Sequence, residues 1–379
     1  MTAFSEGSPS SQNQSPSSIE TSKDSFLYSP SEELFFEELK HLKAYDRSPK
    51  PQGWLLSPLY VVHYLMGGEL EGKYISPKYI GPRSLIEVAV ATLATDRALL
   101  LLGVPGTAKS WVSEHLAAAI SGQSTLLIQG TAGTDEEHLR YGWNYASLLA
   151  KGPHEDALVP SPLFRGMQEG KLVRLEELTR MSAEVQDSLI TLLSEKMMPI
   201  VELNQTLRAR AGFNIIATAN HKDQGVHELS AALKRRFNVV ILPLPDSLET
   251  EVQIVNHRLA DLTSSLKLPP LQNQERWIEI LILMFRELRS GETFDGMRVV
   301  KQPSSTLSTA ELLSTLLNMW SHAVYFKHPF DAPLMASHVY NTVIKDPIQD
   351  PLILQEYVEG VVKTRTDWND VYQALKELI

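Results

Sequence analysis

LLLLGVPGTAKSWVSEHL, residues 99–116, combines an apolar run, a turn rich in Gly and Pro, and the start of an amphipathic segment. The apolar run predicts a buried strand, and the spacing of apolar residues after the turn predicts a helix. A strand that leads through a glycine turn into a helix presents free backbone N–H groups and the positive end of the helix dipole to an anion. The stretch therefore predicts a loop that cradles a nucleotide phosphate.

The predicted phosphate loop consists of eight residues, Gly103, Val104, Pro105, Gly106, Thr107, Ala108, Lys109 and Ser110. Gly103 and Gly106 permit close approach of the backbone to a phosphate. Lys109 would reach the outer phosphates, and the Ser110 hydroxyl would bind Mg2+. Ala108 stands where the usual pattern has glycine, and we expect it to be tolerated because the residue before a helix often lies in ordinary helical space. A glycine-rich turn that merely packs is the alternative interpretation.

A second apolar run, KLVRLEE at residues 171–177, ends in two adjacent carboxylates. A site for Mg2+ and ATP needs one acid to hold the hydrated metal and another to orient or deprotonate the attacking water. We assign Glu176 to the metal, together with Ser110, and Glu177 to the water. Two residues are unusual here, because Asp is commoner than Glu176 at the metal position and Arg174 lies within a buried strand. An acidic helix start is the alternative interpretation.

Two further segments carry polar residues next to apolar runs. FNIIATAN, residues 213–220, ends in Asn220, whose amide would lie beside the acidic strand and bond the attacking water or the γ-phosphate. Arg235 and Arg236 directly precede another apolar run, and arginine stabilises charge on a transferred phosphoryl group, often from a neighbouring subunit. We favour Arg236 for this catalytic role, with Arg235 able to share it. A turn asparagine and a basic surface pair are the alternatives.

Helical periodicities separate the apolar runs, which predicts an α/β fold. Five runs read as strands, at residues 98–103, 124–130, 171–177, 213–220 and 239–244. Because they are apolar on both faces, they predict a parallel sheet sandwiched by helices. Only helical patterns follow, at residues 247–262, 274–288, 304–326 and 368–379. We predict a disordered Ser-rich tail over residues 1–30, a nucleotide-binding domain with an N-terminal helical extension over residues 31–246, and a helical lid with C-terminal helices over residues 247–379.

The composition excludes several classes of protein. The chain has 379 residues and no cysteine, so disulfides and thiolate metal sites are absent, which fits a reducing cytoplasm. No apolar stretch approaches the ~18 residues that span a bilayer, and the N-terminus lacks the pattern of a signal peptide. The net charge of -10 argues against a surface devoted to nucleic acid. We therefore expect a cytoplasmic protein with no membrane partner, and nucleic acid is only the second choice of partner.

Four segments occur in the order GVPGTAKS, LVRLEEL, IIATAN and ALKRRF and precede a helical lid, an order that resembles AAA+ ATPases and specifically the MoxR group. That group shows a phosphate loop of the form GxPGxAKS, so the alanine before the lysine matches the family. The resemblance covers roughly residues 75–325 and includes a hairpin before the Asn220 strand. It implies an ATP- and Mg2+-dependent ring, commonly a hexamer, that remodels proteins as a chaperone does, with partners that carry von Willebrand A domains.

The lid departs from the MoxR pattern. That group tends to show an SPRA-like segment whose arginine touches the γ-phosphate, whereas KQPSSTLSTAELLS at residues 301–314 contains no arginine. Arg298 is the nearest candidate and Lys301 the next. The resemblance therefore leaves the identity of a lid cation open.

Two other functions stay open on the sequence alone. The hairpin and its residues Arg208 and Arg210, which could face a central pore, favour a nucleic-acid translocase of the related helicase branch. Glu176 and the missing lid arginine favour a module that binds ATP to control its assembly and hydrolyses it weakly.

Overall fold

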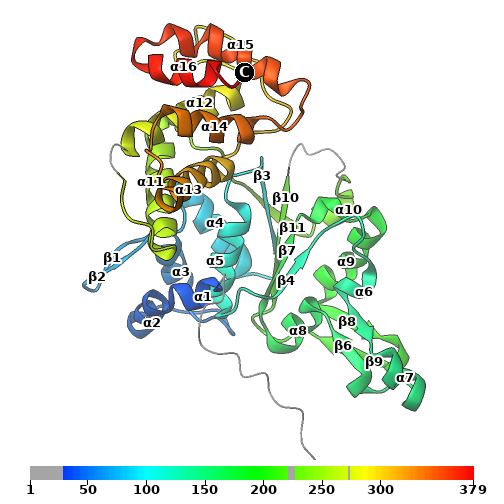
Figure 1. Cartoon of the computed structure of the whole chain (residues 1–379). Coiled ribbons are helices and arrows are strands. Elements are labelled where there is room, and N and C mark those ends of the chain that lie inside the picture. The colour runs from blue at the N-terminus through cyan, green and yellow to red at the C-terminus, as the bar shows by residue number, and fades with distance from the viewer. Residues whose placement is uncertain (1–28, 221–226, 272–273) are drawn as a thin grey trace, which may run out of the picture.

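A five-stranded parallel sheet forms the centre of the N-terminal part of the molecule (Figure 1). The structure, a computed structural model, describes residues 29–220, 227–271 and 274–379. The strands lie in the order β11–β3–β10–β7–β4. Their bounds are β3 Ala98–Gly103, β4 Leu127–Gln129, β7 Leu172–Glu176, β10 Asn214–Asn220 and β11 Phe237–Ile241. The predicted fold class is confirmed, since helices cover both faces of this parallel sheet.

The apolar run that predicted β3 explains why the sheet is covered on both sides. Successive side chains of a strand point to opposite faces. Leu99 and Leu101 pack into one hydrophobic cluster and Ala98 and Leu100 into another, one on each face. The first face is covered by α3 Pro58–Met66, α4 Arg83–Leu93 and α5 Lys109–Ser121, and the second by α8 Pro162–Glu169, α9 Ala183–Glu195 and α10 Ala231–Lys234. Each of these six helices therefore buries apolar side chains in one of the two clusters that cover the sheet.

The N-terminal helical extension consists of two helices rather than one, α1 Ser31–Leu34 and α2 Phe36–Tyr45, which break at Phe35. They pack on the cluster that contains α3 and α5 through Leu39 and Leu42. A small antiparallel pair, β1 Gly68–Leu70 and β2 Lys73–Ile75, precedes α4 and was not predicted. Of the tail predicted over residues 1–30, residues 1–28 lie outside the described residues.

An arm extends from the second face of the sheet (Figure 1). We use "arm" for residues 136–160 together with the hairpin at residues 197–208, which the MoxR resemblance implied. Its elements are α6 Glu136–Leu139, β5 Tyr141–Trp143, α7 Tyr145–Lys151, η1 Glu155–Ala157, β6 Leu158–Pro160, β8 Met197–Ile200, η3 Val201–Leu203 and β9 Gln205–Arg208. The Tyr141 hydroxyl donates to a Glu202 carboxylate oxygen at 2.9 Å, so the two parts of the arm contact each other.

The C-terminal part contains only helices in its described residues, as predicted. They are α11 Leu248–Ser265, α12 Gln274–Ser290, α13 Thr309–Phe326, α14 Ala332–Val343, α15 Asp350–Gly360 and α16 Asn369–Lys376, with short turns η4 Val362–Thr364 and η5 Thr366–Trp368. They share one hydrophobic core. The sequence patterns missed α14 and α15, each of which has proline in its first turn, where the missing N–H is harmless. Throughout the part of the chain that the structure describes, no helix has both the length and the apolar character needed to cross a membrane.

The turn between β3 and α5 corrects one expectation. Ala108 has φ 61° and ψ 23°, in the left-handed region, and not in ordinary helical space as the sequence suggested. Gly106 is also left-handed, with φ 83°. The loop bends through both residues before it enters α5 at Lys109. A non-glycine residue in this region costs about 1–2 kcal/mol, so the fold carries strain at Ala108.

Ala108→Gly is expected to stabilise the protein. Glycine relieves the backbone strain, which is worth about 1–2 kcal/mol. Its greater conformational freedom in the unfolded chain costs about 0.5–1 kcal/mol. The free energy of unfolding should therefore rise by about 0.5–1 kcal/mol. Chemical denaturation measures it. Ala91→Gly is the matched control, because Ala91 is exposed within α4, and should lower stability by about 1 kcal/mol. Equal destabilisation by both changes would contradict the strain at Ala108.

Candidate nucleotide-binding site

The predicted phosphate loop, the acidic pair and Asn220 converge at the carboxyl ends of the central strands. Parallel strands all end at the same edge of a sheet, so residues that follow them become neighbours. Asn220 of β10 pairs with Gly103 at the start of the phosphate loop, and Glu176 of β7 pairs with Gln129 of β4. The strand register therefore places the loop, the acidic pair and Asn220 at one edge.

Lys109 lies at the first position of α5 and folds back over the loop. Its ammonium Nζ donates to the carbonyl oxygens of Gly103 at 3.1 Å and Val104 at 2.9 Å. The Thr107 hydroxyl donates to the same Val104 oxygen at 3.0 Å, and both side chains are buried. The loop is thus compact, with its cation held among backbone atoms at the N-terminus of α5, where a phosphate would bind.

The Glu176 carboxylate accepts hydrogen bonds from four side chains. Its Oε2 accepts hydrogen bonds from the hydroxyls of Ser110 at 2.7 Å and Thr218 at 2.6 Å. Its Oε1 accepts from the Ser113 hydroxyl at 2.6 Å and the Arg174 guanidinium at 3.0 Å. The two predicted metal ligands, Ser110 and Glu176, are therefore in direct contact.

Burial alone would raise the pKa of the Glu176 carboxyl, but hydrogen bonds from Ser110, Ser113 and Thr218 outweigh it, and the Arg174 charge adds to their effect. The pKa of Glu176 consequently lies below its usual value, and the group is ionised at neutral pH. A carboxylate beside a serine hydroxyl is a donor set of the hard oxygens that Mg2+ prefers. Among the described residues no cluster of three or more acidic or histidine side chains forms a cage, so phosphate and water would complete the shell.

Glu177 and Asn220 also meet. The Asn220 amide Nδ2 lies 3.1 Å from each carboxylate oxygen of Glu177. Arg180 lies 3.5 Å from Glu177 Oε2. Glu177 itself has φ 56°, which turns its side chain away from the buried strand and separates it from the neighbouring Glu176. The adjacent acids thus occupy different surroundings, one at the loop serine and one at the amide, as their different predicted roles require.

Sequence reasoning missed two hydroxyl groups of the site, Thr218 and Ser113. The distance along the chain from each of these residues to a predicted site residue could have identified it. Thr218 lies two residues before Asn220 and therefore on the same face of β10. Ser113 lies three residues after Ser110 and therefore on the same side of α5.

The lid touches the phosphate loop through α13. A methyl group in place of the Gly106 hydrogen would lie 2.4 Å from Ser308 Cβ, so only glycine fits this approach. Ser308 caps α13, and its hydroxyl and the Glu311 carboxylate bond each other's backbone N–H groups. In Figure 1, α13 lies close to the end of β3.

The two lid cations that the sequence offered as γ-phosphate contacts lie elsewhere. Arg298 donates to the carbonyl oxygen of Gly360 in α15. Lys301 forms an ion pair with Glu356 of the same helix at 2.6 Å. The lid residue that contacts the loop in this structure is Ser308 and not one of the two cations.

Arg235 and Arg236 lie at the other edge of the sheet. β11 begins beside Ala98, the first residue of β3, whereas the loop begins at Gly103, about 16 Å farther along that strand. Arg235 is exposed, and the Arg236 guanidinium donates to the Ser194 hydroxyl at 2.8 Å. The structure therefore does not bring either arginine to the phosphate loop of its own chain.

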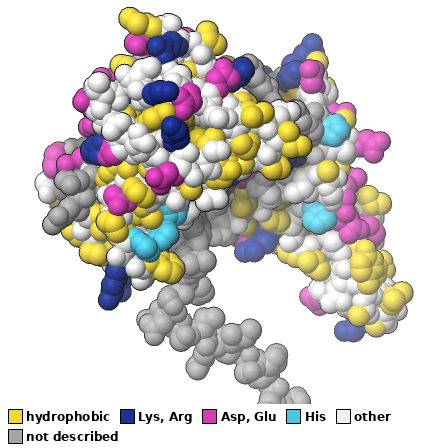
Figure 2. Space-filling model, turned by 45° about the horizontal axis from the view of Figure 1, so that its top comes forward, with side chains coloured by type: hydrophobic (Ala, Val, Ile, Leu, Met, Phe, Trp, Pro, Cys, Tyr) yellow, Lys and Arg dark blue, Asp and Glu magenta, His cyan; other side chains and the backbone are white. Residues whose placement is uncertain are grey.

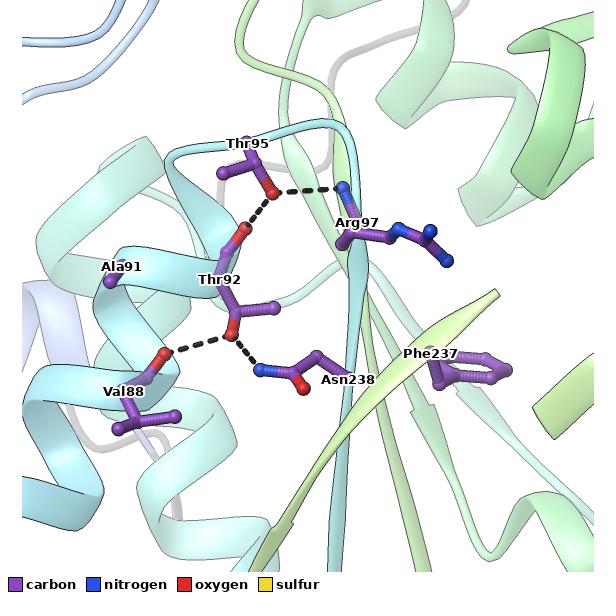
Figure 3. A pocket seen from close by; sticks show the side chains of 7 residues that line it. All are labelled: Val88, Ala91, Thr92, Thr95, Arg97, Phe237 and Asn238. Atoms are coloured by element: carbon purple, nitrogen blue, oxygen red, sulfur yellow. Dashed lines mark hydrogen bonds between the residues drawn. The ribbon is translucent and has the colours of Figure 1, made fainter. Parts of the chain in front are cut away.

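A shallow hollow of about 550 Å3 lies near these arginines and apart from the loop (Figure 3). The Thr92 hydroxyl accepts a hydrogen bond from Asn238 within it, and Arg97 donates to the Arg235 carbonyl oxygen. Its lining residues are Val88, Ala91, Thr92, Thr95, Arg97, Phe237 and Asn238. The lining of the hollow contains none of the predicted site residues.

Comparison with known proteins agrees with this geometry. Residues 98–237 match the family model of an AAA domain of the dynein-related subfamily, and residues 249–378 match that of a YehL-like AAA+ ATPase C-terminal domain. The uncharacterized protein YehL of Escherichia coli strain K12 is 40% identical over 357 residues, which cover 92% of this chain and 97% of YehL.

Two more distant proteins match only in part. An uncharacterized protein of Staphylococcus haemolyticus is 26% identical over 168 residues, which cover 44% of this chain and 63% of that protein. The ADP complex of NtrX from Brucella abortus aligns with a TM-score of 0.47 at 13% identity, over 74% of this chain and 58% of that one. The extent and identity of the match to YehL decide the family: the chain belongs to the YehL-like AAA+ ATPases, with an AAA domain of the dynein-related class.

Proposed function

We propose that this AAA+ protein is a MoxR-like motor. It binds ATP and Mg2+ at the phosphate loop, hydrolyses ATP as a ring, commonly a hexamer, and uses the cycle to remodel partner proteins that carry von Willebrand A domains. The observation that carries the proposal is the pairing of Ser110 with Glu176 beside the pairing of Glu177 with Asn220. One pair suits a metal and the other suits a water molecule.

Each residue has a distinct role in this proposal. Lys109 leaves its loop carbonyls and binds the outer phosphates. Ser110 and Glu176 would hold Mg2+, which neutralises phosphate charge when it is bound. Glu177 accepts a proton from the attacking water, and the Asn220 amide, already in contact with Glu177, orients that water.

The position of Arg236 supports hydrolysis in an assembly. Its guanidinium lies at the edge of the sheet that is opposite to its own loop, so it serves a phosphate only when another subunit brings one there. An arginine supplied in this way stabilises charge on the transferred phosphoryl group. A ring places such an edge of each subunit beside the loop of the next.

The arm supports a protein substrate over nucleic acid. Its end displays exposed Tyr145, Leu149, Val159 and Val201, and Figure 2 shows hydrophobic side chains gathered there. Arg208 pairs with Met197 at the base of the hairpin, away from the turn. Apolar side chains at a projecting end fit a protein partner, whereas nucleic acid would require cations. Turnover that rises on addition of single-stranded DNA would contradict this choice.

Lys109→Ala is expected to abolish detectable nucleotide binding and leave the fold intact, because the ammonium is the principal charge on the loop that faces a phosphate. Isothermal titration calorimetry with ATP measures the loss, and circular dichroism checks the fold. Lys301→Ala is the matched control and should bind ATP as the parent does, because Lys301 pairs with Glu356. ATP binding of undiminished affinity by Lys109→Ala would show that the site lies elsewhere.

Glu177→Gln is expected to bind ATP normally and to hydrolyse it at least roughly tenfold more slowly, since the amide cannot accept the proton of the water. A phosphate-release assay at saturating ATP measures turnover. Glu184→Gln changes an exposed glutamate of α9 in the same way and should leave turnover unchanged. Unchanged turnover in Glu177→Gln would assign the base to another residue.

Mixing Lys109→Ala with Arg236→Ala is expected to restore part of the ATPase activity that each variant lacks alone. Some interfaces of mixed rings then pair an intact loop with an intact arginine, whose contribution is ~10^3-fold or more where such arginines are known. Native mass spectrometry confirms that mixed rings form. The same mixture with Arg235→Ala in place of Arg236→Ala shows which arginine acts. Mixed rings with no activity above either variant would contradict action between subunits.

A further inference from the structure

Arg174 is a buried charge in the middle of β7, with 7% of its surface exposed. Its guanidinium donates to the Ser113 hydroxyl at 3.0 Å and to Glu176 Oε1 at 3.0 Å. It also donates to the carbonyl oxygens of Ser110 at 3.1 Å and Ser124 at 3.2 Å. A buried charge is costly unless it is paired and hydrogen-bonded, and this strand position, which usually suits an apolar residue, carries a cation with four hydrogen bonds.

Arg174 and Glu176 are two residues apart on one strand, so their side chains lie on the same face. The guanidinium and the Ser113 hydroxyl both donate to Oε1 of the carboxylate, and the Ser110 and Thr218 hydroxyls donate to Oε2. Glutamate is longer than aspartate by one bond, about 1.5 Å, and has one more torsion to immobilise. Arg174 removes that freedom, because a carboxylate held at one oxygen presents the other in one direction.

We propose that Arg174 is the positioning residue of the metal-binding carboxylate, and that Glu176 and Arg174 form one compensated pair. Arg174 holds Oε1, which lets a glutamate act at a position where aspartate is commoner. The inference rests on the proposed Mg2+ and ATP site and assigns a role to a residue that touches neither ligand.

The charge arrangement supports the pairing. Glu114 of α5 is buried on the other side of the guanidinium, with its Oε2 3.9 Å from Arg174 Nη1. Arg174 therefore separates two buried carboxylates, and like charges in such a place repel strongly. The Ser31 hydroxyl of α1 donates to Glu114 Oε1 at 2.6 Å, which holds that second carboxylate in its place. Without the guanidinium, Glu176 would lose both a hydrogen bond and its charge partner.

The gain in ATP affinity on addition of Mg2+ distinguishes positioning from plain structural support. Affinity is measured by calorimetry for ATP with EDTA and for ATP with saturating Mg2+, in the full-length protein. Support for α5 would affect both affinities, whereas positioning of Glu176 affects only the part that depends on the metal. Arg174→Gln should bind ATP in EDTA with an affinity within about twofold of that of the parent. Its Mg2+-dependent gain in affinity should be smaller than the parent's by about tenfold or more, the scale on which supporting contacts tune metal sites.

Glu176→Asp completes a double-mutant cycle. The shorter side chain loses contact with Arg174, so this single variant should also lose Mg2+-dependent gain, and the loss should be smaller when Arg174 is already Gln. Arg174→Lys keeps the charge and should restore part of the gain, which provides a second variant if Arg174→Gln does not fold. Arg365→Gln, which removes a different arginine from a buried glutamate, Glu287, is the matched control and should keep the full gain.

Three outcomes decide the matter. Loss of the Mg2+-dependent gain with strong coupling between the two positions supports the pair. Equal loss of affinity with and without Mg2+, or additive effects of the two changes, overturns it and leaves Arg174 as structural support. Absence of ATP binding by the parent protein in both solutions would instead refute the proposed function on which the inference rests.

Discussion

The hydrogen bond between Ser110 and Glu176 is the contact on which the rest of the site depends. It joins the first turn of α5 to the end of β7, and the Thr218 hydroxyl extends it to β10. Burial alone would raise the pKa of this carboxyl, and these hydrogen bonds help to lower it below its usual value. The loop, Glu176 and the strand of Asn220 are thereby held as one unit, and the chemistry proposed for them requires that rigidity.

The contact between Gly106 and Ser308 connects this unit to the C-terminal helices. The segment before Ser308 is held in turn by Asp350 of α15, whose buried carboxylate accepts hydrogen bonds from the backbone N–H and the hydroxyl of Ser304 at 2.8 Å. Tightly packed contacts transmit small displacements because packed interiors are dense and barely compressible. The segment at residues 304–308 therefore connects the phosphate loop with α15.

The polarity of the parallel sheet separates the predicted site residues into two groups. All five strands run in one direction, so residues after them gather at one edge and residues before them at the other. Glu177 and Asn220 belong to the first group and Arg236 to the second. The two groups therefore lie at opposite ends of the strands within one chain, and the role proposed for Arg236 requires a second copy.

The sequence by itself determined the sheet, the phosphate loop, the acidic pair and Asn220, because apolar runs and the residues that end them are local signals. It could not determine the left-handed backbone of Ala108, which depends on how the loop must bend between β3 and α5. It also could not determine α14 and α15, because their apolar faces become apparent only when they pack against the other helices. The sequence marked both Arg174 and Glu176 as unusual, but only the tertiary structure shows the hydrogen bond between them. Only the tertiary structure decided that the lid meets the loop through Ser308 and not through a cation. This contact joins residues about two hundred positions apart in the chain. It depends on packing between distant segments, which no local sequence pattern predicts.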